Sequence, residues 1–395
     1  MLCKTIPKLK CTARLAQFRF LTKPAGRRKD NPEVKMQAWK IHSYDGPSEL
    51  QLTNVSIPII RSPKDVLVKV EAASVNPIDI AMTNGYGASL LNLMRKTNCS
   101  RAYDELELPL TLGRDFAGVV VSKGYNVGDK LEIGEEVWGV VPLDQQGCHA
   151  NYVVVNSNVV RSRPRRLSNT EAASILYAGL TAWSALWYTG GLCYKTLLAT
   201  RRRRVLVMGG SGGVGTIAIQ LLKAWNTHVI STCSGDAVET LQSLGADVVI
   251  DYKQDDADRQ IISEGPYDII LDCAKQGPEL VRKKGYPCDT YVTLNSPMLR
   301  NFDQYGLIMG TIQNLGDIAR LNIPIAQNKG CVKWGFFVPD QTGMNVLQGL
   351  VESGRIVPVI QEVYPFEDLP LAFERAKQGH LRGKLVIDVK SARDD

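Results

Sequence analysis

The sequence predicts an α/β protein in which a small β-barrel is followed by a doubly wound parallel sheet. Between Met36 and Arg166, short stretches of alternating apolar residues are separated by Gly, Asn and Asp turns, as in small barrels. From Val205 onward, continuously apolar stretches alternate with helical segments. That alternation is typical of a parallel sheet covered by helices on both faces.

The barrel prediction rests on four short strands. Val66, Val68 and Val70 alternate with charged residues, which indicates a half-buried strand. Residues 116–121, 136–141 and 151–155 repeat this pattern. Residues 87–109 form a polar, irregular stretch that predicts an insertion over a cleft. Residues 171–187 are expected to be helical and to lead into the second part of the chain.

A glycine-rich turn follows the first strand of the predicted parallel sheet. Residues 205–208 are apolar, Gly210, Gly212 and Gly215 have the spacing G-x-G-x-x-G, and residues 216–225 form a helical pattern. Such glycines allow a tight turn, close approach of a pyrophosphate and close packing of helix on strand, with the phosphates at the positive helix end. The predicted cofactor-binding residues of the turn are Ser211, Gly212, Gly213, Val214 and Gly215.

Further apolar stretches complete the doubly wound pattern. Strands are predicted over residues 228–233, 248–251, 268–272 and 291–294, with a helix over residues 236–244. After about residue 335 the pattern predicts a strand, a helix over residues 344–352 and another strand.

The end of the second of these strands favours NADPH over NADH. An NAD site usually has a carboxylate there, about 20 residues past the glycines, for the ribose hydroxyl. This chain instead has Ser231, Thr232 and Ser234, whose hydroxyls can bind a 2′-phosphate without repelling it. Asp236 is expected in the first turn of the next helix, where the helix dipole favours an acid, with a ribose ligand as the alternative. No Lys or Arg directly follows the strand to pair with the phosphate.

The formal net charge of +7 comes from the N-terminal segment. Residues 1–29 contain nine bases and no acid, and removing those nine from the 47 basic residues leaves 38 bases against 40 acids. We therefore expect no nucleic-acid partner. A basic, acid-free, amphipathic leader over residues 1–35 is typical of a mitochondrial presequence, with a disordered tail as the alternative. No apolar run approaches the length of a membrane span.

No metal site is expected from the cysteines and histidines. The nine cysteines are scattered without a C-x-x-C pair, and the four histidines form no zinc-like cluster. Scattered thiols fit a reducing compartment such as the mitochondrial matrix or the cytosol. The basic run at residues 201–204 precedes the first sheet strand and is interpreted as a solvated strand approach, with a binding role as the alternative.

Several motifs resemble the zinc-free quinone oxidoreductases of the medium-chain dehydrogenase/reductase superfamily. They are S-V-N-P-I-D at residues 74–79, L-G-R-D-F-A-G-V-V at 112–120, E-A-A at 171–173, G-L-T-A-W at 179–183, G-A-D at 245–247, D-Y-K at 251–253 and G-H-L-R-G-K at 379–384. The resemblance implies a GroES-like catalytic barrel (residues 36–166), a Rossmann NADPH-binding domain (167–334) and a C-terminal segment (335–395) that returns to the barrel.

The resemblance also implies catalysis without zinc. Zinc-bearing relatives have a cysteine in place of Asn76 and a histidine in place of Arg114, so hydrogen bonds would have to polarise the acceptor. Asn76 and Tyr86 are the expected residues that orient or protonate it. Their alternatives are a turn before Pro77 and an exposed loop aromatic.

The remaining cofactor contacts are likewise implied by the resemblance. Ser234 and Tyr252 would contact the 2′-phosphate, and the loop His380, Leu381 and Arg382 would return to the cofactor, with Arg382 supplying the missing charge. Phe336 would line the nicotinamide pocket. A buried edge tyrosine, a solvated turn and a core phenylalanine are the alternatives. Residues 273–277 depart from the paired glycine common in the family, which puts the nicotinamide-ribose loop in doubt.

Taken with the leader, these features predict a mitochondrial NADPH-dependent oxidoreductase that transfers hydride to a quinone or enone. The resemblance further implies a part in ubiquinone metabolism, contact with a reticulon-family protein and a homodimer through the nucleotide-domain sheet. An enoyl-thioester reductase is the enzymatic alternative, and it would need a roomier cleft with basic residues. An NADPH-sensing scaffold without turnover is the alternative of another class.

Overall fold

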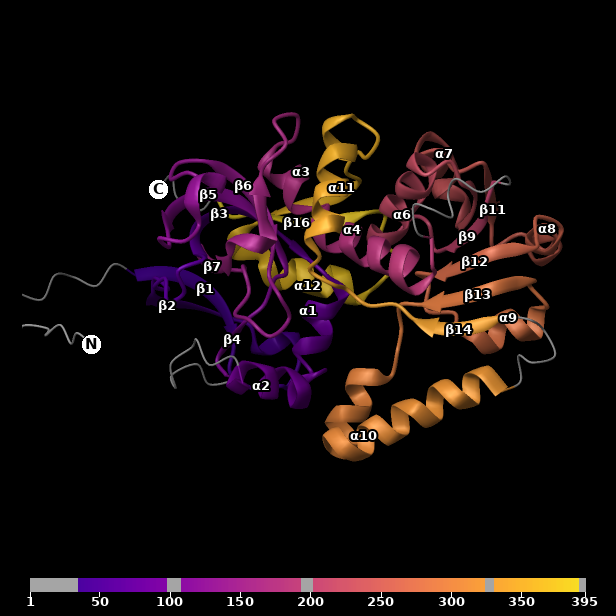
Figure 1. Ribbon diagram of the computed structural model, residues 1–395, viewed down its shortest axis with the longest axis horizontal. Coiled ribbons are helices and arrows are strands. Elements are labelled where there is room, and N and C mark those ends of the chain that lie inside the picture. Colours follow the sequence, from indigo (N-terminus) through magenta and orange to yellow (C-terminus); the bar gives the residue numbers. More distant parts are fainter. Residues whose placement is uncertain (1–34, 98–107, 193–201, 324–329, 391–395) are drawn as a thin grey trace, which may run out of the picture. The chain divides into compact units, whose positions relative to one another are not determined.

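The computed structural model of the protein describes residues 35–97, 108–192, 202–323 and 330–390 (Figure 1). The predicted presequence therefore lies outside the described residues except for Lys35, where the first strand begins. The described strands form a three-stranded sheet, a seven-stranded sheet and a six-stranded sheet. In the part of the chain that the structure describes, no helix is both long enough and apolar enough to span a bilayer.

The first two sheets form the barrel part of the molecule. One has the order β2-β1-β4, and the other has the order β15-β16-β3-β5-β6-β8, with β7 also paired to β3. Val66, Val68 and Val70 of β3 are fully buried, so the predicted inward-facing pattern is confirmed. The strands are β1 (Lys35–Ile41), β2 (Gln51–Ser56), β3 (Asp65–Val75), β4 (Leu110–Thr111), β5 (Asp115–Lys123), β6 (Glu136–Val140), β7 (Tyr152–Asn156), β8 (Val160–Ser162), β15 (Ile360–Pro365) and β16 (Lys384–Asp388).

The C-terminal strands are part of this barrel. β16 runs antiparallel to β3, with Leu385 opposite Val75, and β15 runs parallel to β16. Helix α12 (Leu369–Lys377), which the sequence pattern did not predict, connects them. No strand lies directly after residue 335, whereas helix α11 (Gln341–Glu352) agrees with the prediction.

The six-stranded sheet is parallel throughout and has the doubly wound order β11-β10-β9-β12-β13-β14. The predicted bounds of β10 and β11 are confirmed, and the short edge strand β14 was not predicted. The strands are β9 (Arg204–Met208), β10 (His228–Cys233), β11 (Val248–Asp251), β12 (Tyr267–Asp272), β13 (Cys288–Thr293) and β14 (Cys331–Trp334).

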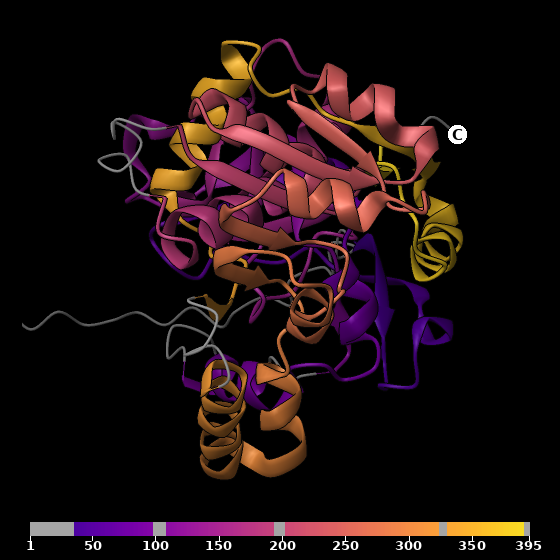
Figure 2. The same ribbon diagram turned by 90° about the vertical axis from the view of Figure 1, so that its right-hand side faces the viewer.

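Both faces of this parallel sheet are buried. Val205 and Val207 of β9 belong to one apolar cluster, while Leu206 and Met208 belong to another. Figure 2 shows helices in front of and behind the strands. Helix α3 (Asn169–Ala173) packs against β3 and β5 of the barrel. The described helices that lead into, flank or connect the strands of the parallel sheet are α4 (Leu176–Trp183) with the π-helical turn Ser184–Thr189, α6 (Gly213–Ala224), α7 (Val238–Ser243), α8 (Ala257–Ser263) and α9 (Pro278–Lys284).

The predicted irregular insertion at residues 87–109 is wrong where the structure describes it. Helix α2 (Ala88–Thr97) lies there, after helix α1 (Pro77–Met82), and residues 98–107 lie outside the described range. Asp303 accepts hydrogen bonds from the backbone N–H groups of Gly87 and Ser89, at 2.6 and 2.9 Å, and so stabilises the start of α2. That carboxylate is more than 200 positions away in the sequence, so local pattern could not show it.

The basic run before β9 is used in ion pairs within the domain. Arg202 pairs with Asp247 at 3.2 Å, Arg203 with Asp268 at 2.7 Å and Arg204 with Glu264 at 2.7 Å. Arg201 lies outside the described residues. These contacts favour the interpretation as a strand approach over a separate binding site.

Helix α10 (Met298–Asn322) is a hairpin of two limbs. Gly306, with φ +72°, interrupts the helix and allows the reversal. The Asn301 side chain on the first limb donates to Asn314 on the second at 2.7 Å. In Figures 1 and 2, α10 lies beside α2, and it also packs against β14.

The end of α10 covers the outer edge of the sheet. The Asn322 side chain accepts from the Val332 backbone N–H at 2.8 Å and donates to the Val332 carbonyl at 3.1 Å. It therefore satisfies the backbone groups on the outer side of β14 that a further strand would otherwise pair with.

Replacing Asn322 should expose those backbone groups. Asn322→Leu is expected to lower the free energy of unfolding by about 1 kcal/mol, because two hydrogen bonds to buried backbone are lost. A lower midpoint of urea unfolding would measure this loss. Gln313→Leu, which removes a surface contact to Asp317 on the same helix, should change the stability by no more than about 0.5 kcal/mol. Equal midpoints for the two variants would contradict the edge-capping role.

Candidate active site

The glycine turn after β9 is shaped by packing as much as by backbone freedom. Gly209, one residue before the spaced triad, is the residue with positive φ, +77°. A Cβ on Gly210 would lie 2.0 Å from the Ser231 hydroxyl, and one on Gly215 would lie 2.4 Å from the Gly209 carbonyl oxygen. Gly210 and Gly215 therefore allow the turn to pack closely against β10 and against itself.

Gly212 has a different surrounding. A Cβ there would meet only the Gly209 carbonyl oxygen, at 3.7 Å. Gly212 directly precedes α6, whose first backbone N–H groups and positive dipole end face this space. The turn Ser211 to Gly215 thus lies at the N-terminus of a helix, the kind of position at which a helix stabilises a phosphate.

A basic side chain from the C-terminal part of the chain reaches the end of β10. The Arg382 guanidinium donates to the Ser234 hydroxyl at 2.5 Å and to the Ser211 hydroxyl at 3.4 Å. It also pairs with the Asp236 carboxylate at 2.8 Å. Arg382 thus occupies the position of the base that the sequence lacks directly after the second strand.

The loop that carries Arg382 is fixed to the glycine turn. The Gly383 N–H donates to the Ser211 carbonyl at 2.8 Å, and the Arg382 N–H donates to the Gln361 side chain at 2.7 Å. His380 has positive φ, and Leu381 packs against the apolar core. The structure therefore brings the predicted residues 380–382 to the predicted cofactor turn.

Asp236 lies in the first turn after β10, as expected. Hydrogen bonds from Arg382 and Ser234 hold the pKa of its carboxyl well below the usual range, and the same pairing raises the pKa of Arg382. The carboxylate is thus ionised at neutral pH and binds the same guanidinium that a 2′-phosphate would bind. Tyr252 lies close by, because its backbone N–H donates to the Cys233 carbonyl at 3.0 Å, and its side chain is half exposed.

Asn76 is buried, and both ends of its side-chain amide are engaged. Its Nδ2 donates to Asp115 at 3.0 Å and to Ser74 at 3.3 Å, and its Oδ1 accepts from Lys384. The amide therefore holds the surrounding network, and a direct hydrogen bond to an acceptor would require one of these contacts to be exchanged.

Lys384 is a site residue that the sequence reasoning missed. Its ammonium contacts Asn76 and lies 3.8 Å from Asp115 on the barrel side, while its side-chain carbons lie against Gly213 at the start of α6. Burial lowers its pKa, and Asp115, Asp79 and Cys148 oppose that shift. A lysine directly after Gly383, followed by the three apolar residues 385–387 of the same strand, was the available signal.

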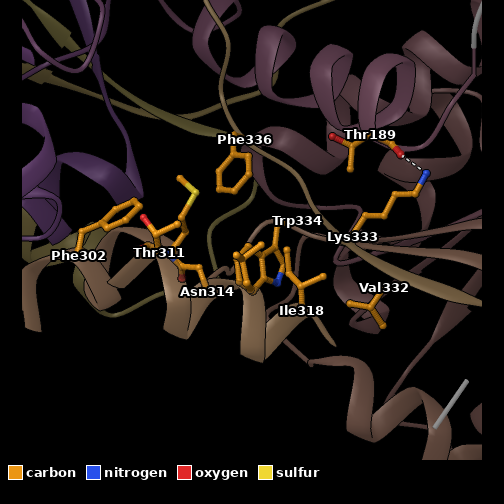
Figure 3. A pocket seen from close by; sticks show the side chains of 11 residues that line it. Thr189, Phe302, Thr311, Asn314, Ile318, Val332, Lys333, Trp334 and Phe336 are labelled. Atoms are coloured by element: carbon orange, nitrogen blue, oxygen red, sulfur yellow. Dashed lines mark hydrogen bonds between the residues drawn. The ribbon is translucent and has the colours of Figure 1, made fainter. Parts of the chain in front are cut away.

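Tyr86 lies next to the start of α10. Its hydroxyl donates to the Ser296 carbonyl at 3.4 Å. Burial raises its pKa while Arg300 lowers it, and the net shift is upward. The phenol is therefore protonated at neutral pH and can act as a hydrogen-bond donor. Phe336 lines a cavity beside α10 (Figure 3), and its backbone carbonyl accepts from the Ser184 hydroxyl.

The loop that departs from the family pattern, residues 273–277, is organised by one carboxylate. Asp272 accepts from the backbone N–H groups of Ala274, Gln276 and Gly277 at 2.9 to 3.2 Å. The Tyr291 hydroxyl donates to the same carboxylate at 2.6 Å. The loop is thus held in a defined shape without the paired glycine.

Arg114, which the family resemblance relates to a zinc ligand of zinc-bearing relatives, is bound to protein groups. Arg114 is fully buried, donates to the carbonyls of Pro142 and Gln145, and lies 3.7 Å from Asp79. Among the described residues, no group of three or more His, Cys, Asp or Glu side chains could hold a metal ion, and the five described cysteines are free thiols.

Comparison with known proteins agrees with this architecture. Residues 62–165 match the family profile described as alcohol dehydrogenase GroES-like domain, and residues 244–387 match the profile described as zinc-binding dehydrogenase. The barrel, the parallel sheet and the dinucleotide turn define a nicotinamide-dependent oxidoreductase of the medium-chain dehydrogenase/reductase superfamily.

The relatives narrow this class. The chain is 46% identical to "NAD(P)H oxidoreductase RTN4IP1, mitochondrial" of Drosophila melanogaster, over 91% of this chain and 88% of the relative. It is 35% identical to "Reticulon-4-interacting protein 1, mitochondrial" of Caenorhabditis elegans, over 89% and 94%. The structure of the quinone oxidoreductase from Coxiella burnetii matches with a TM-score of 0.70 and 28% identity, over 90% of this chain and 100% of that one. The chain therefore belongs to the family of the NAD(P)H oxidoreductase RTN4IP1.

Removing the Arg382 side chain should weaken NADPH binding selectively. Arg382→Ala is expected to raise the Kd for NADPH roughly tenfold to a hundredfold, because charge-assisted hydrogen bonds to a phosphate are lost. The Kd for NADH should stay within about twofold, and calorimetry measures both. Lys377→Ala, which removes one positive charge from the exposed end of α12, is the matched control. A parallel loss of NADH binding in Arg382→Ala would contradict the assignment.

The charge on Lys384 should set an alkaline limit to activity. The ammonium exists below its pKa, which burial shifts below the ordinary 10.5, so turnover should fall as the pH rises through that value. Lys384→Arg keeps the positive charge and should shift the alkaline fall in kcat to higher pH. Lys384→Met should lower kcat at all pH values. The measurement is kcat from neutral to alkaline pH. If kcat of Lys384→Arg falls at the same pH as that of the wild type, the alkaline fall in kcat belongs to another group.

Proposed function

We propose that the protein is an NADPH-dependent, zinc-independent oxidoreductase that reduces a quinone or a conjugated carbonyl. The observation that carries this proposal is the meeting of Arg382, Ser234 and Ser211 at the end of β10. A guanidinium with two hydroxyls suits a phosphate dianion, which NADPH has on its adenosine ribose and NADH lacks. The quinone oxidoreductase among the similar structures supports the choice of acceptor.

Residues from several parts of the chain would hold the proposed cofactor. The space in front of Gly212 and the start of α6 would take the pyrophosphate, and Arg382 with Ser234 and Tyr252 would take the 2′-phosphate. Residues 380–382, fixed to the turn, would close over it, and Phe336 would lie on the nicotinamide side. When bound, NADPH supplies the hydride.

The charge that develops on the acceptor would be met by hydrogen-bond donors in place of a metal ion. Tyr86 carries a proton at neutral pH and is the proposed donor. Asn76 and Arg114, which the family resemblance relates to zinc ligands, are both engaged in hydrogen bonds with protein groups. We assign Asn76 to positioning Lys384, whose ammonium supplies positive charge at the junction of barrel and glycine turn. Quinones and enones are electrophilic enough to react without a Lewis acid.

The cellular setting is proposed from the relatives and from the leader. Relatives with "mitochondrial" in their names, together with the basic residues 1–35, support a place in the mitochondrion, and we propose the matrix. Participation in ubiquinone metabolism and contact with a reticulon-family protein are part of the same proposal. A homodimer formed through the edge of β14 would have to displace Asn322 from Val332, so the structure does not favour that geometry.

The alternative functions differ in the acceptors with which the protein would oxidise NADPH. An enoyl-thioester reductase would oxidise NADPH with enoyl thioesters but not with quinones, and an NADPH-sensing scaffold would bind NADPH tightly without oxidising it. Following NADPH absorbance with quinones, enones and enoyl thioesters separates the three functions.

Within this assay, Tyr86→Phe should lower kcat about tenfold or more, because a proton donor is removed. Its Kd for NADPH should be unchanged, since the hydroxyl contacts Ser296 and not the cofactor turn. Tyr305→Phe, at an exposed tyrosine on α10, is the matched control. If kcat of Tyr86→Phe equals that of the wild type, Tyr86 is not the donor.

A further inference from the structure

A cavity lies between α10, strand β14 and the residues that follow β14 (Figure 3). Its volume is about 510 Å³, within the range of roughly 300–1,000 Å³ typical of small-molecule sites. Its apolar walls are Met298, Phe302, Leu315, Ile318, Trp334 and Phe336.

Three of the four polar side chains that line the cavity, those of Thr311, Asn314 and Lys333, are bound to the protein. The Thr311 hydroxyl donates to the Leu307 carbonyl at 2.7 Å, and Lys333 donates to the Thr189 carbonyl at 3.0 Å. Asn314 accepts from Asn301 at 2.7 Å and donates to the Met298 carbonyl at 3.3 Å. A polar ligand would have to break these contacts, whereas a hydrocarbon would leave them intact.

The cavity adjoins the proposed acceptor site. Phe336 is both a wall of the cavity and the residue proposed for the nicotinamide side. Met298, another wall, stands two positions after Ser296, whose carbonyl accepts from the Tyr86 hydroxyl. The same segment of chain thus contacts the proposed proton donor and lines the cavity.

The wall of the cavity that the second limb of α10 forms is open to solvent. Leu315 is 65% exposed and Ile318 is 39% exposed although both line the cavity. A second copy of the chain could cover these side chains by pairing with β14. Such pairing would require Asn322 to release the Val332 backbone groups, so we do not assign these side chains to a dimer interface. A long apolar substituent could enter from this side while a ring lies toward Tyr86.

The geometry points to this cavity as the binding site for the hydrocarbon side chain of the acceptor. The substrate class is a quinone with an alkyl or isoprenoid substituent. This inference rests on the proposed quinone reduction, and it adds that chain length, and not only the ring, determines which quinones the enzyme prefers.

The experiment compares two benzoquinones with the same ring, one without a side chain and one with a decyl chain. Each methylene that is buried should improve kcat/KM roughly fourfold, from about 0.8 kcal/mol per group. The wild-type ratio of kcat/KM, decyl over unsubstituted, should therefore exceed about tenfold. Leu315→Gln should reduce that ratio about tenfold, because an amide replaces an apolar wall. Ile308→Gln, at a 79% exposed position on the same limb, should leave the ratio unchanged.

Calorimetric titration of the cofactor-free protein with the decyl quinone separates this inference from the proposed function. If neither quinone is reduced but the decyl quinone binds, and Leu315→Gln weakens that binding, the cavity assignment stands and quinone reduction fails. Equal kcat/KM for the two quinones, or equal ratios in the two variants, overturns the assignment while quinone reduction stands. A shift from dimer to monomer in Leu315→Gln without a change in the ratio would overturn it in favour of an interface between copies. Absence of both binding and reduction overturns both.

Discussion

The hydrogen bond from the Gly383 N–H to the Ser211 carbonyl connects the two halves of the site. Gly383 has φ +87°, and a Cβ there would lie 2.1 Å from the Val359 carbonyl oxygen, so only glycine fits this crossing. Because the chain is fixed at this point, the residues on either side of it take defined places. Arg382 reaches the end of β10, and Lys384 begins the strand that pairs with β3 of the barrel.

The two basic residues beside Gly383 have opposite surroundings. Arg382 is partly exposed and pairs with an exposed carboxylate, so its interaction with Asp236 is screened by water and contributes little to folding. Lys384 is buried with Asn76 and Asp115, where an unpaired charge would be costly. The exposed pair can therefore exchange partners with a ligand, whereas the buried one is fixed. This difference suits a phosphate contact in one case and a positive charge held at a fixed position in the other.

The local sequence pattern was sufficient to predict the elements that are defined by neighbouring residues alone. The bounds of β10 and β11 follow from short runs rich in Val and Ile between turn residues, and the glycine turn follows from its spacing. The carboxylate that stabilises the start of helix α2, Asp303, is distant in sequence, so this contact could not be predicted from local pattern. The engagement of Asn76 could not be predicted either, since Ser74, Asp115 and Lys384 come from three different strands. Arg382 was found only through family resemblance, because no local rule relates it to Ser234.

The Asp236 carboxylate already binds the Arg382 guanidinium, so the proposed selectivity for NADPH depends on Asp236 as well as on Arg382. Without a phosphate, it holds the Arg382 guanidinium in place beside Ser234, so little side-chain entropy remains to be lost on binding. When a phosphate arrives, it competes with that carboxylate and is repelled by it. The same carboxylate stands near the position at which NAD sites hold the ribose hydroxyls. The proposed preference for NADPH would therefore depend on the phosphate's two negative charges outcompeting one carboxylate for Arg382, and the margin would depend on salt because the pair is exposed.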